Sequence, residues 1–434
     1  MKTGEESSEK NDKGDHVSLN IGSLAANVRK DLENLGPNPL SEECCIYKVP
    51  QRLRVLNDKA YTPQVVSIGP FHRDKKELQE MEDYKRMYLQ DFLKWSNASL
   101  EDFIELIGDR EATLRNCYAE TFTDLSSEEF VKMMLVDAAF VIMVILKQLF
   151  HAYQGRNDRI FSCPWKIREV GIDLCLLENQ IPFFILQSML KLSKISFPYN
   201  ESDTLAHEFL KTVWDSWVTD DCEEINSSSG IEHFVHFLRI YQQPTRPRRP
   251  EILERRSTKT AKTLHQAGVK FQSGSDKKLL HIEFEKAFLK IPPFRISDDT
   301  EILLRNLQAF EQCHCGDNYV GNYLYMMDLL VDSPEDVEVL VRYGIIENLL
   351  SNNEAVSSTL FYNLSRENMI SKNFYFSEVL VDLNKYYGRD WPKWKANLRQ
   401  NYFQNPWSIF SVIAAAFLLL LTIIQAVCSI IQLV

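Results

Sequence analysis

The apolar positions of this chain recur mostly at helical spacing. Asp74 with Glu77 predicts the start of a helix, and Ser99 predicts the start of the next one. Ser126–Glu129 has the pattern of a capping box, and Ser333-Pro334 combines a cap with a first-turn proline. Only residues 279–296 alternate as strands do. The pattern therefore predicts a mainly α fold: a large multi-helix globular body with a small β hairpin.

The C-terminal end has the pattern of one transmembrane helix. Residues 400–434 contain no charged side chain, and 409–430 is almost wholly apolar. A helix of this length reaches about 33 Å, against about 30 Å for the hydrocarbon core of a bilayer. The shorter apolar run 133–146 carries Asp137 and predicts a buried core helix instead. The predicted transmembrane residues include Ile409, Phe410, Ala415, Phe417, Leu420, Ile424, Val427 and Ile430.

The flanks of this segment predict its orientation. Trp407 lies where an interfacial aromatic anchor is expected, and Lys393, Lys395 and Arg399 precede the span, whereas no cation follows it. The positive-inside rule then leaves the body in the cytosol. The chain also begins without the basic and apolar pattern of a secretory signal. Four glycosylation sequons, at Asn97, Asn200, Asn226 and Asn363, are interpreted as incidental but would become meaningful in a translocated chain.

Changes in composition along the chain divide it into five regions. We expect a variable, partly disordered N-terminal tail at 1–40 and a helical region at 41–242. A basic exposed connector at 243–275 separates this region from the β hairpin and further helices at 276–405, and the membrane anchor occupies 406–434. Within and beside the connector, Asp220–Gly230 and Gln242–Lys262 are candidate contact loops, although a merely solvated loop is the preferred interpretation.

Charge and cysteine content exclude some classes of protein. The 434 residues carry a net charge of −11, which argues against nucleic-acid binding as the main task. Nine scattered cysteines do not form the framework of a disulfide-rich domain and suit a reducing compartment.

Residues able to carry chemistry are present, but no catalytic or metal motif is complete. Cys313-His314-Cys315 lacks the second pair of a zinc site, and His233 and His236 lack the spacing of a metalloprotease helix. Nucleophile-elbow, phosphate-loop and dinucleotide signatures are missing from the sequence. We therefore expect no catalytic residue, no cofactor-binding residue, no metal ligand and no enzyme.

Two polar strings stand among apolar neighbours. Proline and glycine, as in Pro50, Gly69 and Pro70, predict tight turns between extended pieces of the N-terminal part. Farther along, Glu178, Asn179 and Gln180 interrupt an apolar helix pair that Pro182 breaks. Such residues, if buried, need hydrogen-bond partners. They are predicted to cap neighbouring backbone, with ligand binding as the alternative.

Several long strings in this order resemble the plant-specific family called domain of unknown function 247, over about 45–425. The strings are IYKVPQRLR (46–54), AYTPQVVSIGPFH (60–72), MEDYKRMYLQDFL (81–93), EEFVKMMLVDAAF (128–140), DLCLLENQIPFFIL (173–186), AGVKF (267–271), TEILLRNLQAFEQC (300–313) and YFQNPWSIFSVIAAAFLLLLTIIQ (402–425). The chain departs from the usual pattern at Ala138-Ala139, where glycine and cysteine are common, at His233–Leu238, and at the additional Cys315.

The resemblance implies a helical body with one C-terminal span and supplies no enzymatic activity. Similar grass proteins are encoded at self-incompatibility loci. We therefore expect a single-pass plant membrane protein, at the plasma membrane, whose partners are the lipid bilayer and an unidentified protein. The alternatives are a membrane-tethered enzyme that would use Glu178, Asn179, Asp137 or His72, and a self-associating scaffold that forms homo-oligomers.

Overall fold

The computed structural model describes most of the chain, in ten stretches. They form two units that are described separately, 1–42 and 43–434. The described residues are 20–34, 41–155, 158–198, 202–218, 230–244, 257–275, 277–350, 352–369, 374–389 and 406–433.

The first unit contains one described helix, α1 (Ile21–Asn34). The side chain of Asn20 accepts a hydrogen bond from the backbone N–H of Ser23, 3.2 Å away, as N-cap residues do. The predicted tail at 1–40 thus contains a helix, and residues 1–19 and 35–40 lie outside the described ones. The large apolar side chains of α1 are exposed: Ile21, Leu24, Val28 and Leu32.

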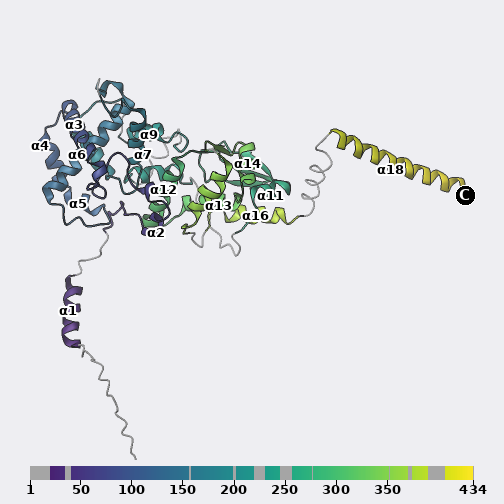
Figure 1. The fold of residues 1–434 in the computed structure, drawn as a ribbon, viewed down its shortest axis with the longest axis horizontal. Coiled ribbons are helices and arrows are strands. Elements are labelled where there is room, and N and C mark those ends of the chain that lie inside the picture. The colour runs from purple at the N-terminus through teal and green to yellow at the C-terminus, as the bar shows by residue number, and fades with distance from the viewer. Residues whose placement is uncertain are drawn as a thin grey trace, which may run out of the picture. The chain divides into compact units, whose positions relative to one another are not determined.

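The second unit begins with helices gathered around α6 (Ser127–Leu149), as Figure 1 shows. The middle of α6 is buried on all sides, which confirms the core helix predicted at 133–146. A helix that is apolar all round belongs in the interior of a body this large. The helices of this part are α2 (Gln51–Arg54), α3 (Glu80–Trp95), α4 (Leu100–Gly108) and α5 (Glu111–Asn116), with short 3-10 turns η1 (Asp58–Tyr61), η2 (Lys76–Leu78) and η3 (His151–Tyr153).

Three of the predicted helix starts are confirmed by reciprocal capping boxes. Ser99 pairs with Asp102, Ser126 with Glu129, and Ser333 with Asp336.

The start predicted at Asp74 is wrong. The Asp74 carboxylate is paired with Arg73 Nε at 3.1 Å and caps no backbone. The turn η2 intervenes, and α3 begins only at Glu80.

The remaining helices continue the body and pack on a shared core. Their bounds are α7 (Pro164–Asp173), α8 (Phe183–Ser193), α9 (Ser202–Val213), α10 (Phe234–Ile240), α11 (Ala261–Gln266), α12 (Thr300–His314), α13 (Tyr319–Leu330), α14 (Pro334–Arg342), the π-helical η4 (Ala355–Phe361), α15 (Tyr362–Ser365) and α16 (Ser377–Tyr387).

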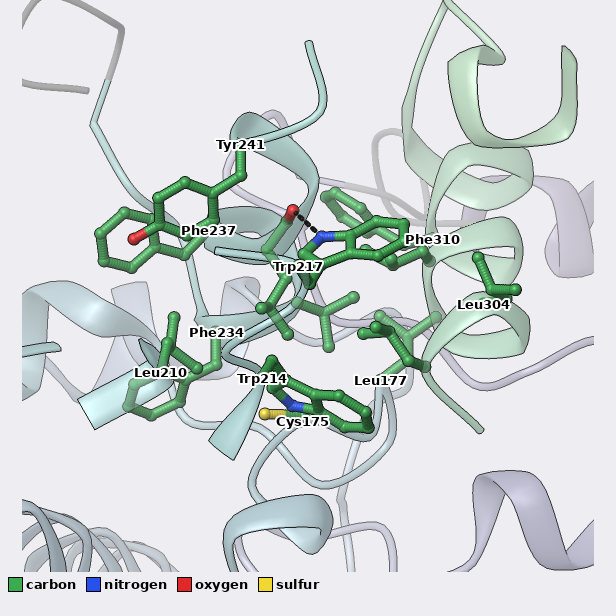
Figure 2. Packing of buried hydrophobic residues seen from close by; sticks show 14 of the residues in the cluster. Cys175, Leu177, Leu210, Trp214, Trp217, Phe234, Phe237, Tyr241, Leu304 and Phe310 are labelled. Carbon is green, nitrogen blue, oxygen red and sulfur yellow. Dashed lines mark hydrogen bonds between the residues drawn. The ribbon is translucent and has the colours of Figure 1, made fainter. Parts of the chain in front are cut away.

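Aromatic side chains from distant parts of the sequence meet in this core (Figure 2). The indole N–H of Trp217 donates to the backbone carbonyl of Leu238, 2.9 Å away. The ring of Trp217 also lies edge-on to that of Phe294. One hydrophobic cluster therefore includes residues of both predicted helical regions, 41–242 and 276–405.

Short strands form two small sheets. The predicted hairpin is confirmed in β2 (Glu283–Glu285) and β3 (Phe288–Ile291), which pair antiparallel. In addition, β1 (Lys270–Ser273) pairs with β3, and β4 (Phe294–Ile296) pairs with β5 (Ile346–Asn348), both in parallel. The sequence pattern did not predict these parallel pairs, because their partners are separated by other elements.

The predicted basic connector at 243–275 is only partly described. Residues 245–256 lie outside the described ones. Contrary to the expectation of an exposed connector, its later part forms α11 and β1 and is packed against the body. Apolar side chains fix this packing: Ala261, Leu264, Val269 and Phe271 are all buried.

The C-terminal helix α18 runs from Pro406 to Leu433 without a break. Its described side chains are exposed, including Phe410, Phe417, Leu420 and Ile424. No helix in the part of the chain that the structure describes meets the combined length and apolarity that a membrane span needs.

Candidate functional site: a buried polar hub

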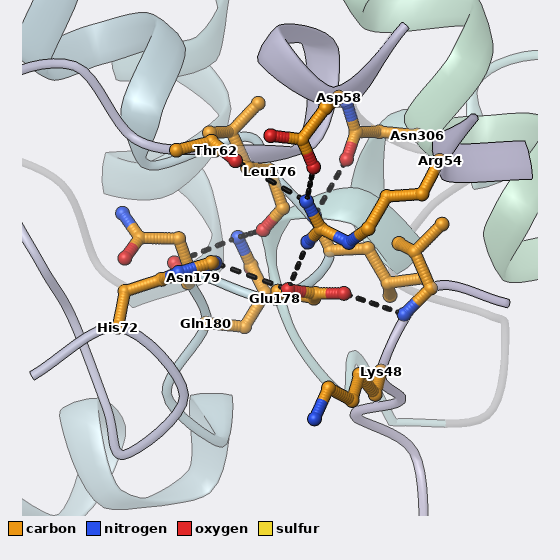
Figure 3. Close-up of polar contacts among 12 residues, drawn as sticks. Lys48, Arg54, Asp58, Thr62, His72, Leu176, Glu178, Asn179, Gln180 and Asn306 are labelled. Carbon is orange, nitrogen blue, oxygen red and sulfur yellow. Dashed lines mark hydrogen bonds and ion pairs between the residues drawn. The ribbon is translucent and has the colours of Figure 1, made fainter. Parts of the chain in front are cut away.

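Three consecutive polar residues form the centre of the body's polar interior (Figure 3). Glu178, Asn179 and Gln180, here called the polar hub, lie between α7 and α8 and are at most 2% exposed. Burial without partners would cost each of them free energy. Each hub residue therefore has to be understood from the groups that it contacts.

Glu178 joins two turns of the N-terminal part. Its Oε1 accepts the backbone N–H of Val49 at 2.6 Å, and its Oε2 pairs with the guanidinium of Arg54. His72 Nε2 lies 3.1 Å from the same Oε2. Burial alone would raise the pKa of Glu178, but His72, Arg54 and the Val49 N–H lower it below its ordinary value. The carboxylate is thus held ionised inside the body.

Asn179 and Asp173 together hold the extended segment 64–69. Asn179 Oδ1 accepts from the N–H of Ile68 at 2.7 Å, and its amide donates to the carbonyls of Val66 and Asp173. Asp173 accepts the N–H groups of three successive residues, from Gln64 to Val66, at 2.7 to 2.9 Å. Burial raises the pKa of Asp173 to about 7, although these N–H groups act in the opposite direction. Side chains thus satisfy N–H groups that no strand in the described part of the chain pairs with.

Asp137 of α6 completes the hold on this segment. Its carboxylate accepts the N–H of Gly69 at 2.8 Å and the ammonium of Lys85 at 2.5 Å. Lys85 also donates to the carbonyl of Ser67. Burial alone would lower the pKa of Lys85, but Asp137 and Glu82 raise it above its ordinary value. An ion pair between α3 and α6 therefore supports the backbone of the segment.

Gln180 ties the hub to α10 and to its own loop. Its amide donates to the carbonyls of Leu174 and Leu176 at 2.7 Å, and its Oε1 accepts the N–H of Phe234 at 3.0 Å. A Cβ on Gly69 would lie 2.7 Å from the Gln180 carbonyl, and Gly69 has φ +73°. Only glycine fits this close approach in a left-handed conformation.

The structure brings the predicted structural-motif residues together. Pro50 precedes α2 and adjoins Val49, the partner of Glu178, and Pro70 is buried beside Gly69. Pro182 precedes the first residue of α8. Of the four residues proposed for a tethered enzyme, Asp137, Glu178 and Asn179 are each engaged by backbone N–H groups or by a charged partner. His72 Nε2 lies 3.1 Å from Glu178 Oε2 without a well-aligned hydrogen bond.

The residues predicted to span the membrane or to anchor at its surface are not part of the polar hub. All eight predicted span positions fall within α18, where the side chains of Ile409 and Ile430 are outside the described set. Trp407 is in α18 but its side chain is not described, and Lys393, Lys395 and Arg399 lie outside the described residues.

Sequence reasoning missed several members of the hub's surroundings. Asp173, Arg54 and Lys85 were not singled out, although Asp173 stands alone in an apolar string. Asn306 of α12 was also missed: its Oδ1 accepts the N–H of Leu177 at 2.9 Å, and its amide donates to the carbonyl of Ala60. Its position as a single charge in an apolar run could have indicated a buried role for Asp173. The sequence around Arg54, Lys85 and Asn306 contains no comparable indication.

A second polar cluster lies where α10 begins. His233 caps α10: its Nδ1 accepts the N–H of His236 at 3.2 Å. Its Nε2 lies 3.1 Å from the carbonyl of Cys45. Because Nδ1 accepts a hydrogen bond, Nε2 must carry the ring hydrogen and donate it, so this imidazole is neutral. Burial lowers the pKa of His233 to about 3.

Glu232 lies between two further histidines of this cluster. Its carboxylate is 3.2 Å from His236 Nδ1 and 3.3 Å from His314 Nε2. Burial would raise the pKa of Glu232, but these two imidazoles lower it strongly. His314 also stacks on Phe310 and contacts the hydroxyl of Tyr47 at 3.1 Å.

The chain is thus a mainly helical protein with two small sheets, in which buried polar side chains of the hub hold distant loops together. The family model DUF247, described as a plant protein of unknown function, matches residues 46–421. The chain belongs to this family.

Two curated relatives come from Arabidopsis thaliana. The chain is similar to UPF0481 protein At3g47200, with 29% identity over 90% of this chain and 87% of the relative. It is also similar to the putative UPF0481 protein At3g02645, with 23% identity over 92% of this chain and 93% of that relative. No solved structure is significantly similar.

Proposed function

We propose that this chain is a single-pass membrane protein whose helical body binds another protein in recognition or signalling. The observation that carries the proposal is α18, an unbroken helix of 28 residues without one charged side chain. Its apolar side chains are exposed on successive positions, from Leu418 to Leu421, and so on every side of the helix. A lipid bilayer is the environment that such a helix suits.

The anchoring proposal rests on the sequence of the whole helix. The described side chains of α18 cover only 410–411 and 413–427, and the finding on membrane-spanning helices concerns the described residues alone. Taken from Pro406 to Leu433, the helix would be about 42 Å long at 1.5 Å per residue. Such a length suits a thick bilayer, and we propose the plasma membrane with the body in the cytosol.

The polar hub supports binding rather than catalysis as the task of the body. A catalytic group needs a free atom that can reach a substrate. Here the side-chain oxygens already accept hydrogen bonds from backbone N–H groups or pair with buried cations, in Glu178, Asn179 and Asp137. The loops predicted as contact surfaces, Asp220–Gly230 and Gln242–Lys262, lie largely outside the described residues.

Protease protection on sealed microsomes carrying the full-length chain tests the anchoring. We expect the chain to resist extraction by carbonate and the body to be digested without a glycosidase-sensitive shift. A matched chain that ends at residue 405 should be released by carbonate. Release of the full-length chain would contradict the anchor.

The same microsomes test the orientation through the sequons. Asn97 lies before α4 and Asn363 lies inside α15, so Asn97 is the better acceptor of the two. A protected body whose glycan is lost in Asn97→Gln would reverse the proposed orientation and place the body on the far side of the membrane.

Binding is tested separately from anchoring. Full-length protein in mild detergent is crosslinked in plant membranes, and partners are compared with those of an unrelated protein that carries the same α18. A reproducible partner specific to the body supports recognition. Self-association alone, measured as a defined homo-oligomer of the purified chain, would instead favour the scaffold alternative.

A further inference from the structure

Two cysteines far apart in sequence meet beside the start of α10. The backbone N–H of Cys45 donates to the carbonyl of Cys117 at 3.0 Å, and the N–H of Ile46 donates to the same carbonyl at 2.9 Å. Ile46 and Tyr118 form a parallel bridge next to them. The Cys117 thiol donates to the carbonyl of Thr113, 3.3 Å away. The packing of the chain thus places the backbones of two buried cysteines side by side in the interior.

A carboxylate and an imidazole lie beside the thiol of Cys45. The Cys45 sulfur, a carboxylate oxygen of Glu232 and a ring nitrogen of His233 all lie within 4.8 Å of one another. Glu232 Oε2 is buried and accepts no well-aligned hydrogen bond, although His236 Nδ1 is within ion-pairing distance. Buried carboxylate oxygens in folded proteins nearly always have a partner, which is a hydrogen-bond donor, a water molecule or a bound cation. The position of this oxygen beside a thiol and an imidazole favours the cation.

We propose that Cys45, Glu232 and His233 form a binding site for one zinc ion, with the Cys117 thiol turning from the Thr113 carbonyl toward the ion as the fourth ligand. Thiolate, imidazole and carboxylate are the ligands that zinc takes in proteins, and four of them suit a closed structural site. Two thiolates and one carboxylate also offset the charge of the ion in a buried place. Residues 45, 117 and 232–233 share no local spacing, which is why the sequence alone led us to expect no metal.

The surroundings of the site match those of a zinc-bound histidine. His233 can bind the ion through Nδ1 while Nε2–H keeps its bond to the Cys45 carbonyl, 3.1 Å away. Such a bond from the second ring nitrogen to a carbonyl commonly orients zinc ligands. The ion then replaces the His236 N–H as the partner of Nδ1. His236 and His314 flank Glu232 and orient its carboxylate.

Metal content and cobalt substitution test this site directly. Full-length protein purified in detergent, stripped with a chelator and refilled with zinc, should retain one zinc per chain after gel filtration. Refilling with cobalt should give the intense near-ultraviolet band of thiolate-to-cobalt charge transfer together with tetrahedral visible bands. Zinc binding should release protons, because thiol ligands bind only when deprotonated.

Variants decide which residues hold the ion. Cys45→Ser should abolish the charge-transfer band, and Glu232→Gln should weaken zinc affinity by at least tenfold while far-ultraviolet circular dichroism stays unchanged. Cys175→Ser is the matched control, since Cys175 is equally buried but lies near Trp214 (Figure 2). Cys175→Ser should keep the metal.

Three results would overturn the site. The first is wild-type protein that is folded by circular dichroism and holds no zinc after refilling. The second is a zinc affinity that Glu232→Gln and Cys45→Ser leave unchanged. The third is a Cys45–Cys117 disulfide found by mass spectrometry in protein purified without reductant, with no metal uptake after its reduction.

Discussion

The backbone N–H of Gly69 donates a 2.8 Å hydrogen bond to Asp137 Oδ2, and so joins the segment 64–69 to the middle of α6. Asp137 is in turn held by Lys85, which also donates to the carbonyl of Ser67. The segment is therefore fixed by buried charges on two helices and by the polar hub. Since no strand among the described residues pairs with its N–H groups, its conformation depends on a few side chains that can be changed singly.

Replacing Gly69 tests the close approach to the hub. In Gly69→Ala the new Cβ would meet the Gln180 carbonyl at 2.7 Å in a backbone with φ +73°. We expect the free energy of unfolding to fall by about 2 kcal/mol or more. Urea unfolding of the detergent-solubilised chain measures this. Gly108→Ala is the control, because a Cβ there meets no atom within 4 Å. Equal stability of the Gly69 variant and the wild type would contradict the account.

Removing the charge of Glu178 tests the buried ion pair. Glu178→Gln removes the buried carboxylate that faces Arg54, which keeps only the exposed carboxylate of Asp58, and we expect a loss of about 3 kcal/mol in stability. Glu120→Gln, which breaks an exposed pair with Lys48, should cost less than about 1 kcal/mol. Thermal and urea unfolding report both values. Similar losses in the two variants would show that burial of the hub is not what makes this pair matter.

The cap of α10 predicts a pH dependence. Burial lowers the pKa of His233 to about 3, so the unfolded chain binds its proton at a higher pH than the folded chain does. Stability from this residue is therefore complete above about pH 6.5 and is lost as the pH falls toward 3, by at most about 4 kcal/mol.

The comparison that checks this is wild type against His233→Asn, in the presence of a chelator. Asparagine still caps a helix but does not titrate. The difference between the two unfolding curves should shrink as the pH falls from about 6.5 to about 4. The pKa of Asp173 is raised to about 7, so its contribution to the free energy of unfolding falls as the pH rises, opposite to that of His233. Subtracting the two curves removes this contribution, because both proteins contain Asp173. A difference that does not change with pH would contradict a neutral buried His233.

The hairpin offers a stabilising change. Lys286 and Ala287 form its two-residue turn with φ of 51° and 72°, both in the left-handed region. Two-residue hairpin turns of this kind favour asparagine followed by glycine. Ala287→Gly should raise stability by about 0.5–1 kcal/mol, measured by urea unfolding. As the control, Ala309→Gly in the buried part of α12 should lower the free energy of unfolding. A lower free energy of unfolding in both variants would argue against strain in this turn.

Features that depend on neighbouring residues could be read directly from the sequence. The capping boxes at Ser99, Ser126 and Ser333 each involve residues only three positions apart, and the apolar run of α6 is continuous. Each pattern therefore lies within one stretch of sequence and could be predicted from it. The uncharged run that forms α18 was equally plain, and the hairpin follows from one stretch of alternation. The polar run Glu178–Gln180 was recognised as needing partners, but the sequence left those partners open.

Only the folded chain reveals which residues those partners are. Val49 and Arg54 reach Glu178 across more than a hundred residues of chain, as Asn306 reaches Leu177. The parallel pairs β1–β3 and β4–β5, and the meeting of Cys45 with Cys117, likewise depend on how helices pack between them. Local patterns act through contacts a few residues apart, whereas these contacts form only when distant segments are buried together. No periodicity or spacing along the chain records that burial.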